Sequence, residues 1–333
     1  MKILTVLSFA LISVNAFANL KIVTTTSDLA AIASAVGGSN VSVTSIINGA
    51  RDAHRIEAKP SYMSRVSGAD VFIAVGLELE IGYERPILDG SGNSKVAIGR
   101  PGHVYASGFC YILDKPSGSV SRAEGDIHPY GNPHVTLDPY NGRMVAEGLA
   151  SKFSALDKVH ASEYKANLAA FKKKLDTAMF GSALVAKFGG DALWQWDNSG
   201  DFTGKLSAAG MASQLGGWKA KMARVAGTPI VTYHRSLVYL AHRFGLRVVE
   251  ELEPKPGLEP TPGHLATVIK VVEGEHVKAI VQETFFSTKA AKTVSSRTGV
   301  KVLVIPQGVG HSSSATDYIS LFDSIVGILS GGL

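Results

Sequence analysis

The chain has 333 residues, of which 45% are hydrophobic and 18% charged, with a formal net charge of +5 and one cysteine. A chain of this length and apolar content can bury a full core and is long enough for two domains. The modest, scattered positive charge gives no support to nucleic-acid binding. Cys110 alone excludes an intramolecular disulfide and a cysteine-rich zinc cluster, so any metal site must use histidine, aspartate and glutamate.

The first 18 residues have the three parts of a secretory signal peptide. Lys2 supplies the positive charge, Ile3–Val14 the apolar stretch, and Ala16–Ala18 a small-x-small cleavage site. The apolar run is too short to span a bilayer, and no cysteine follows it to carry a lipid anchor. We therefore expect residues 1–18 to be removed and a soluble mature chain to begin at Asn19 in the periplasm.

From residue 20 onwards, short apolar runs alternate with helical patterns. In the first half, strands are predicted at 20–26, 41–47 and 70–76, and helices at 27–38, 61–67 and 140–153. Apolar residues at steps of four and three predict one long helix over 161–179. Residues 189–227 are rich in glycine, aspartate and tryptophan, which favours an ordered surface excursion over a flexible linker, with a shape that the pattern does not define. The alternation then resumes, with strands at 228–234, 246–252, 278–283 and 301–306 and helices from 236, 287 and 315.

Such alternation is typical of parallel βα units. We therefore predict an α/β fold with two βα lobes, each on a parallel sheet, joined by a long rigid linking helix, with a metal cleft between the lobes. The expected boundaries are 19–155 for the N-terminal lobe, 156–185 for the linking helix and 186–333 for the C-terminal lobe. A rigid helix between the lobes would limit hinge motion.

Three histidines lie in similar places in this pattern. His54 follows the second predicted strand, His134 stands just before a helix, and His234 ends a strand. In α/β sheets the loops beyond the carboxyl ends of the strands face the crevice where ligands bind, so the three can converge. No local zinc-finger or HExxH spacing is present. For any one histidine, an ordinary hydrogen-bonded role is the commoner outcome.

Four segments resemble a known family: DAHRIEAKPS, GNPHVTLDP, VTYHRSLVYLAHRFGL and EPTPGHL. They are similar to motifs of the periplasmic zinc- and manganese-binding components of ABC importers, the cluster A-I solute-binding proteins. The resemblance extends from about residue 20 to residue 329 and is weakest near 189–225. It implies a two-lobed fold that binds one transition-metal ion and passes it to an inner-membrane permease and ATPase complex. By motif position, it implies His54, His134 and His234 as ligands.

The fourth ligand is where the chain departs from the family. Relatives usually supply an aspartate in a late LDPLG-like stretch, and here Ile305 or Pro306 stands in its place. Glu283, at the end of a predicted strand, is the preferred substitute, because a dication held by three neutral imidazoles gains from an anionic ligand. Gln307, His311 and a water molecule are the alternatives. Three histidines and one carboxylate favour zinc, with manganese possible, since manganese prefers more oxygen ligands.

Neighbouring polar residues are expected to have lesser roles. Asp138 and Glu57 can accept the second imidazole N–H of a ligand, although Asp138 is more simply the N-cap of the helix that begins near Pro139. His128 belongs to the remnant of a histidine- and acid-rich loop of the relatives and is expected to be a loop residue without metal contact. His103 is expected to be an ordinary surface residue.

The predicted function is that of a monomeric metal carrier, not an enzyme. The competing hypothesis is a secreted zinc hydrolase that uses the same histidines, with Glu283 or Glu57 as general base. No local signature of a nucleophile or base supports it. A third hypothesis, a metallochaperone or adhesin on the same fold, is not separable from transport on sequence alone.

Overall fold

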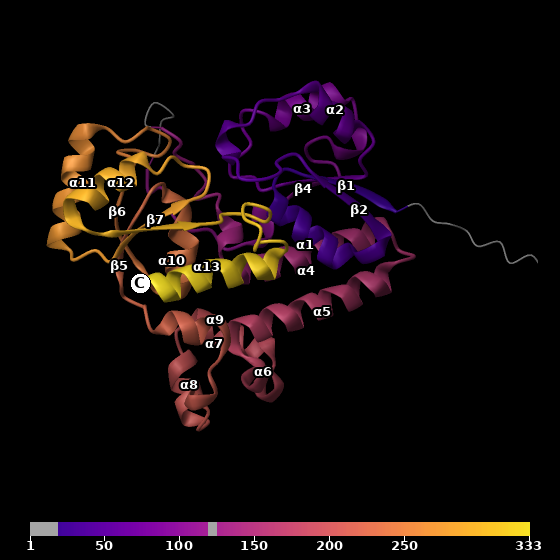
Figure 1. The fold of residues 1–333 in the computed structure, drawn as a ribbon. Coiled ribbons are helices and arrows are strands. Elements are labelled where there is room, and N and C mark those ends of the chain that lie inside the picture. The colour runs from indigo at the N-terminus through magenta and orange to yellow at the C-terminus, as the bar shows by residue number, and fades with distance from the viewer. Residues whose placement is uncertain (1–18, 119–124) are drawn as a thin grey trace, which may run out of the picture.

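The structure is a computed structural model that describes residues 19–118 and 125–333; the predicted signal peptide lies outside them. The described chain forms two α/β lobes, each built on a sheet of four parallel strands (Figure 1). The strand order is β2-β1-β3-β4 in the first sheet and β6-β5-β7-β8 in the second, so the two lobes repeat one topology. The predicted two-lobed α/β fold is confirmed.

The N-terminal lobe is built from β1 (Leu20–Thr24), α1 (Ser27–Gly37), β2 (Val41–Ser45), α2 (Pro60–Ser67), β3 (Val71–Ala74), α3 (Glu84–Ser91), β4 (His103–Tyr105) and α4 (Pro139–Leu156). Both faces of its sheet are covered, and Phe72 and Ile73, on opposite faces of β3, are fully buried. The sequence patterns missed β4, because three residues are too few for a periodicity, and α3, whose Pro86 and Gly90 have low helix propensity. His103, expected on the surface, is buried in β4 with its Nε2 2.9 Å from Glu84 Oε1.

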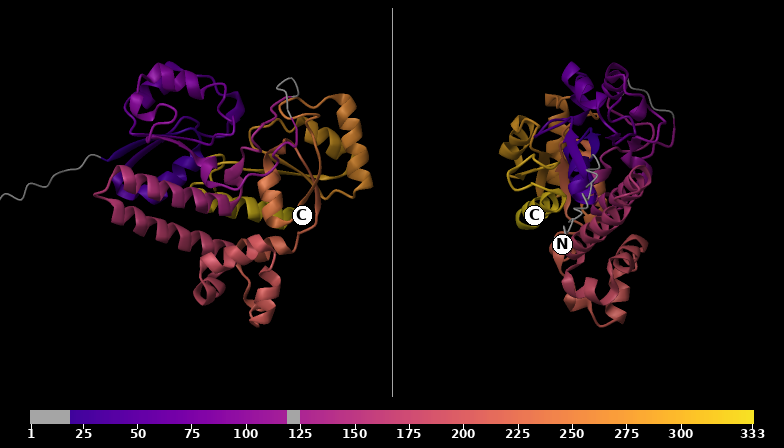
Figure 2. Two further views of the ribbon diagram at one scale, coloured as in Figure 1. Left: turned by 180° about the vertical axis from the view of Figure 1, so that it is seen from behind. Right: turned by 90° about the vertical axis from the view of Figure 1, so that its right-hand side faces the viewer.

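The lobes are connected by α5 (Ala161–Phe180), which runs along one side of both of them (Figures 1 and 2). It is followed by α6 (Ser182–Phe188), α7 (Gly190–Ser199), α8 (Phe202–Ala208) and α9 (Gly217–Ala223). The surface excursion, whose shape the sequence pattern left open, is therefore largely helical. Leu193, Trp194 and Phe202 are buried, and the Trp194 indole N–H donates to Asp176 of α5 at 2.6 Å. This packing outweighs the low helix propensity of the glycines.

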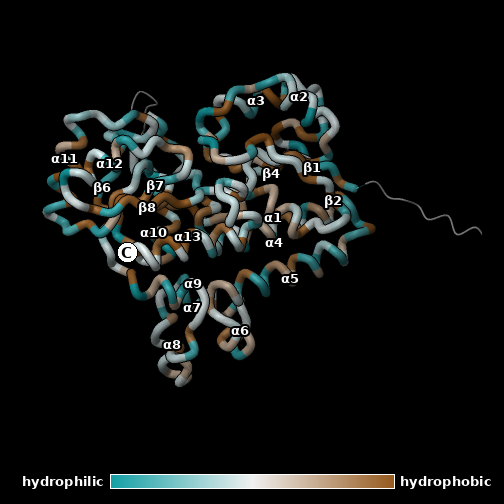
Figure 3. Tube along the Cα trace, viewed as in Figure 1, coloured by the Kyte–Doolittle hydropathy of each residue, from teal (hydrophilic) through white to brown (hydrophobic). Residues whose placement is uncertain are grey.

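The C-terminal lobe contains β5 (Pro229–Thr232), α10 (Val238–Phe244), β6 (Arg247–Glu251), α11 (Pro262–Gly274), β7 (Ala279–Glu283), α12 (Lys289–Thr298), β8 (Lys301–Ile305) and α13 (Tyr318–Gly332). The central strand β7 and the edge strand β8 carry apolar runs, which appear as brown tube in Figure 3. Among the described residues, none of the helices combines the length and the apolar character needed to cross a bilayer.

One apolar core extends beneath both lobes. It includes Ile22 of β1, Leu149 of α4, Leu175 of α5, Val281 of β7 and Leu321 of α13. In addition, the hydroxyl of Tyr318 on α13 donates to the backbone oxygen of Thr136 at 2.6 Å, which ties the last helix to the N-terminal half. Separating the lobes widely would expose this shared core at about 25 cal/mol per Å².

Candidate metal centre

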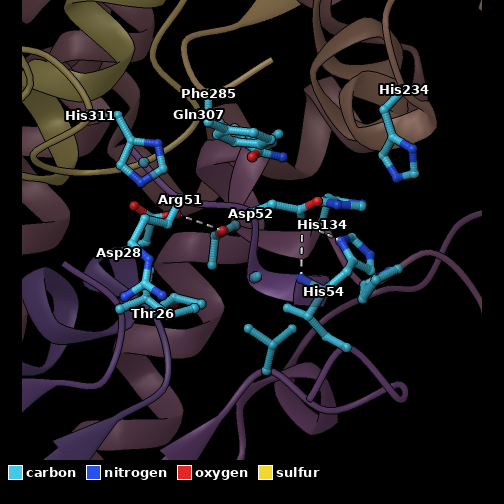
Figure 4. A pocket seen from close by; sticks show the side chains of 18 of the residues that line it. Thr26, Asp28, Arg51, Asp52, His54, His134, His234, Phe285, Gln307 and His311 are labelled. Carbon is cyan, nitrogen blue, oxygen red and sulfur yellow. Dashed lines mark hydrogen bonds and ion pairs between the residues drawn. The ribbon is translucent and has the colours of Figure 1, made fainter. Parts of the chain in front are cut away.

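The carboxyl ends of strands from both sheets face one pocket between the lobes, the position expected for a ligand in parallel sheets. Thr26 follows β1, His234 follows β5, Glu253 follows β6 and Gln307 follows β8, and all four line the pocket (Figure 4). The free space is about 60 Å³, which corresponds to about four water molecules. A pocket of this size suits an ion with a few waters rather than an organic substrate.

The three predicted histidines meet in this pocket. His54 lies on the 3-10 helix Ala53–Arg55, His134 directly precedes the 3-10 helix Val135–Leu137, and His234 follows β5. One ring nitrogen of each lies within 4.8 Å of one ring nitrogen of the others. The ring centroids are 5.2 to 5.4 Å apart. The arrangement allows three nitrogen atoms to contact one ion.

Each of these rings has an oxygen acceptor at its Nδ1. The pairs are His54 with Asp52 Oδ1 at 2.9 Å, His134 with Asn132 Oδ1 at 2.9 Å, and His234 with Glu253 Oε2 at 2.6 Å. An oxygen acceptor at Nδ1 requires the proton on that nitrogen, so a neutral ring has its free lone pair on Nε2. This is how ligating histidines are fixed in one tautomer and orientation.

Two of these acceptors belong to a short local motif. Asp52 and Asn132 stand two residues before their histidines, and each also accepts the backbone N–H of its histidine, at 2.9 and 3.0 Å. Such Asx turns are local, so the repeated pattern Asp/Asn-x-His could have revealed both residues. Glu57, proposed for this role from sequence, is exposed. Asp138 accepts the backbone N–H of Tyr140 at 2.7 Å, which confirms it as the N-cap of α4.

The electrostatics of the pocket suit a dication. Burial lowers the pKa of His134 well below its usual value, with the neighbouring histidines adding to the effect, so this ring stays neutral. Burial also disfavours the charged form of His234, but the hydrogen bond and the charge of Glu253 outweigh burial. The pKa of His234 is therefore raised. Burial disfavours the ionised form of Asp52 as well, but the hydrogen bond and charge of His54 outweigh burial and lower the pKa of Asp52. Ionised Asp52 and Glu253 together offset two positive charges.

Glu283, predicted as the fourth ligand, is not brought into the group. It is the last residue of β7 and fully buried, and one of its oxygens accepts the hydroxyl of Ser236. Burial raises the pKa of Glu283 to about 7. The alternatives Gln307 and His311 line the pocket, but His311 lies across it from His54 and His134 (Figure 4). Among the described residues, no carboxylate joins the three histidines.

A further histidine lies against the group. His128, expected to be a loop residue without metal contact, has its Nε2 3.2 Å from Nε2 of His54. Its Nδ1 is 3.0 Å from the backbone oxygen of Leu77, so this ring too has an oxygen acceptor at Nδ1. The sequence pattern identifies the residue, but it does not indicate where the imidazole ring lies, because Leu77 is far away in the chain.

Leu77 belongs to a turn that is organised by a buried carboxylate. Glu80 accepts the backbone N–H groups of Val75 and Gly76 at 2.7 and 3.0 Å and the hydroxyl of Thr25 at 2.7 Å. Burial is the largest influence on this group and raises the pKa of Glu80 from 4.5 to about 7. The folded protein therefore binds this proton more tightly than the unfolded chain does.

The first prediction concerns the pH dependence of stability. Protonation of Glu80 stabilises the fold fully below pH about 4.5, and this contribution, about 3 kcal/mol, is lost as the pH rises through about 7. We expect Glu80→Gln to remove it, so that the free energy of unfolding of the metal-free protein changes less between pH 5 and pH 8 than in the wild type. Urea denaturation at both values measures the difference. Equal pH dependence in the two proteins would contradict it.

The fold and the pocket define a class of protein: two-lobed α/β proteins in which histidines from both halves meet in the cleft. The family model described as zinc-uptake complex component A, periplasmic, matches residues 22–179 and 209–331. The chain belongs to this family. Members are substrate-binding transport proteins and not enzymes, which agrees with the prediction and sets aside the hydrolase hypothesis. The unmatched interval, 180–208, contains α6, α7 and α8.

The relatives of this chain are named for different metals. The zinc-binding protein AdcA of Streptococcus pyogenes serotype M6 is 24% identical over 86% of this chain, which spans about half of the relative's length. The iron-binding protein YfeA of Yersinia pestis is 22% identical over 94% of this chain and 86% of its own. The structure of FpvC from Pseudomonas aeruginosa, in complex with Mn²⁺, has a TM-score of 0.70 at 21% identity and covers 94% and 98% of the two chains.

Proposed function

We propose that this protein binds one zinc ion through His54, His134 and His234 and delivers it to an ABC-type permease for import. The observation that carries the proposal is the convergence of three imidazole nitrogens within 4.8 Å of one another. The proposal includes the location: a monomeric periplasmic protein, released from its signal peptide near Ala18. Manganese is the second candidate ion.

The donor atoms favour zinc over manganese. Imidazole nitrogen suits zinc, whereas manganese prefers carboxylate, carbonyl and water oxygens. The carboxylates at the pocket, Asp52 and Glu253, are hydrogen-bonded to the outer nitrogens of His54 and His234. They can balance the charge of a dication through the rings without supplying oxygen ligands. A nitrogen-rich site at the join of two lobes is well suited to hold zinc and to release it when the loops move.

The second prediction is that zinc stabilises the folded protein. A ligand that binds only the native state contributes RT ln(1 + [L]/Kd), about 4 kcal/mol at a thousandfold excess over Kd. We expect this increase in the free energy of unfolding on adding zinc to protein stripped with a chelator, with one ion bound per chain in a calorimetric titration. His134→Ala is the control and should show little stabilisation. If zinc left the stability of the wild type unchanged, the carrier proposal would fail.

Delivery needs its own experiment. Proteoliposomes that contain the cognate permease and ATPase should accumulate zinc when supplied with the loaded protein and ATP. The same vesicles should accumulate little when supplied with the same total zinc and the His134→Ala variant. Uptake that is independent of the protein would leave metal binding intact but remove the transport role.

A further inference from the structure

The inference concerns His128 and goes beyond the three ligands proposed above, on which it rests. The ring of His128 lies beside that of His54, with their centroids 5.3 Å apart. This is the same spacing as between His54 and the rings of His134 and His234, 5.2 and 5.4 Å. His54 is thus in contact with three imidazoles at equivalent distances, whereas His128 is outside the group whose ligand atoms all lie within 4.8 Å of one another.

The contact between His54 and His128 has the spacing of two ligands on one ion. Two nitrogens that each lie about 2.0–2.1 Å from a tetrahedral zinc are about 3.3 Å apart. The observed distance between the two Nε2 atoms is 3.2 Å. A close pair of nitrogens is also compatible with a hydrogen bond, so the position of the protons decides between the two interpretations.

The outer partners of the two rings leave no proton for that contact. The Nδ1 of His128 is 3.0 Å from the backbone oxygen of Leu77, which can only accept, so Nδ1 carries the hydrogen. The Nδ1 of His54 faces a carboxylate oxygen of Asp52 at 2.9 Å, with the same consequence. In the neutral rings both Nε2 atoms are therefore lone pairs pointing at each other. A cation between them, either a metal ion or a shared proton, removes the repulsion of the two lone pairs, and a metal ion at this place meets the nitrogens of both rings.

The backbone oxygen that orients His128 is held at a conformational cost. Gly76, Leu77 and Glu78 have φ values of 84°, 56° and 65°, and the last two are non-glycine residues in the left-handed region. Each such residue costs about 1 kcal/mol or more, and strain of this kind concentrates at functional sites. The carboxylate of Glu80 secures the turn by accepting the N–H groups of Val75 and Gly76.

The loop of His128 is also anchored on the other lobe. The backbone N–H of Asp126 donates to the backbone oxygen of Pro256 in the other lobe, at 2.8 Å. Within the loop itself, the N–H of Gly131 donates to the backbone oxygen of His128 at 3.2 Å. In addition, Arg55, next to His54, donates to the oxygen of Gly257 at 3.1 Å. The loop therefore connects the strained turn of one lobe with the segment that follows β6 in the other.

We propose that His128 is the fourth ligand, and that it sets the preference of this site for zinc over manganese. The ion would be held by four neutral imidazoles and by no oxygen, a donor set that favours zinc, cobalt and copper and disfavours manganese. The charge is met by Asp52 and Glu253 behind the rings. No direct carboxylate ligand is then needed, which accounts for a chain that lacks the late aspartate.

The test compares three variants of the mature protein by competition titration with Zn²⁺ and Mn²⁺. His128→Ala should lower zinc affinity about tenfold or more and leave the fold unchanged. His128→Asp, which offers oxygen instead of nitrogen, should raise the affinity for manganese relative to zinc. His276→Asn is the control, because it removes an exposed histidine outside the pocket, and it should leave both affinities unchanged.

The coordination itself can be observed with Co²⁺ as the probe. The visible absorption of bound Co²⁺ should report a four-coordinate nitrogen site in the wild type and in His276→Asn, and a changed one in His128→Ala. If His128→Ala kept wild-type affinity and spectrum while His134→Ala lost binding, the role of His128 would be overturned and the three-histidine carrier would stand. If neither variant lost affinity, the proposed function itself would be wrong.

Discussion

Replacing His234 with alanine is expected to lower zinc affinity by at least about 100-fold, since even outer partners of ligands cost 10–100-fold when removed. The change removes one of three converging nitrogens and leaves Glu253 buried without its partner. Competition titration against a chelator of known affinity measures the loss, and far-ultraviolet circular dichroism checks that the fold persists. Unchanged affinity would show that the ion binds elsewhere.

Two further variants serve as a control and as a test of the alternative ligand. His276→Asn removes an exposed histidine whose φ of 52° asparagine tolerates, and it should leave affinity unchanged. Glu283→Gln distinguishes two ligand sets: the one predicted from the sequence, which includes Glu283, and the one supported by the fold, which does not. We expect it to leave zinc affinity near the wild-type value, because the carboxylate contacts Ser236 and does not line the pocket. A large loss in Glu283→Gln would restore Glu283 as the fourth ligand.

The second large effect is expected at Arg243, which lies outside the pocket. Its Nε donates to both carboxylate oxygens of Asp138, at 2.9 and 3.0 Å, and its Nη1 to Asp197 of α7. The three side chains are at most 5% exposed. Arg243→Met should lower the free energy of unfolding by about 3–5 kcal/mol, because it leaves the buried carboxylate of Asp138 without its cation, whereas Asp197 keeps its ion pair with Lys219. Denaturant titration of the metal-free protein measures this.

The matched control for Arg243 is Arg247, four residues later. Arg247 pairs with Glu275 at 2.8 Å, but the two side chains are 52% and 50% exposed. An exposed pair of this kind contributes about 0–1 kcal/mol, so Arg247→Met should be nearly neutral. Equal losses from the two variants would mean that burial is not what makes the Arg243 network important. Rescue of Arg243→Met by Asp138→Asn would assign the effect to the unpaired charge.

The sequence could predict the positions of the histidines because they depend on strand ends. Apolar runs identify strands, and the carboxyl ends of parallel strands meet at one edge, which brings His54 and His234 to the same pocket. The same logic does not account for the position of Glu283, which lies outside the pocket lining. Side chains alternate along a strand, and Glu283 shares a face with Ala279 and Val281, which pack into the main core. Which face of β7 meets the cleft is decided by the packing of the helices, not by the strand itself.

Other parts of the site depended on contacts that span the chain. Glu253 meets His234 because β6 lies beside β5, and no local pattern connects the two residues. His128 is placed by Leu77, on the turn after β3, some fifty residues earlier. The helices α7 and α8 were missed because their glycines argue against helix, while Trp194 and Phe202 gain more from burial than the glycines cost.

The apolar core common to both lobes has a consequence for how long the proposed zinc ion would stay bound. Because α13 and α5 pack into the same core as α1 and α4, the halves cannot part without breaking it, and the ion must leave through local opening of the loops around His54, His128 and His234. The dwell time of zinc is then set by loop kinetics. A permease that pulls on one of these loops could hasten unloading without altering the equilibrium affinity of the undocked carrier.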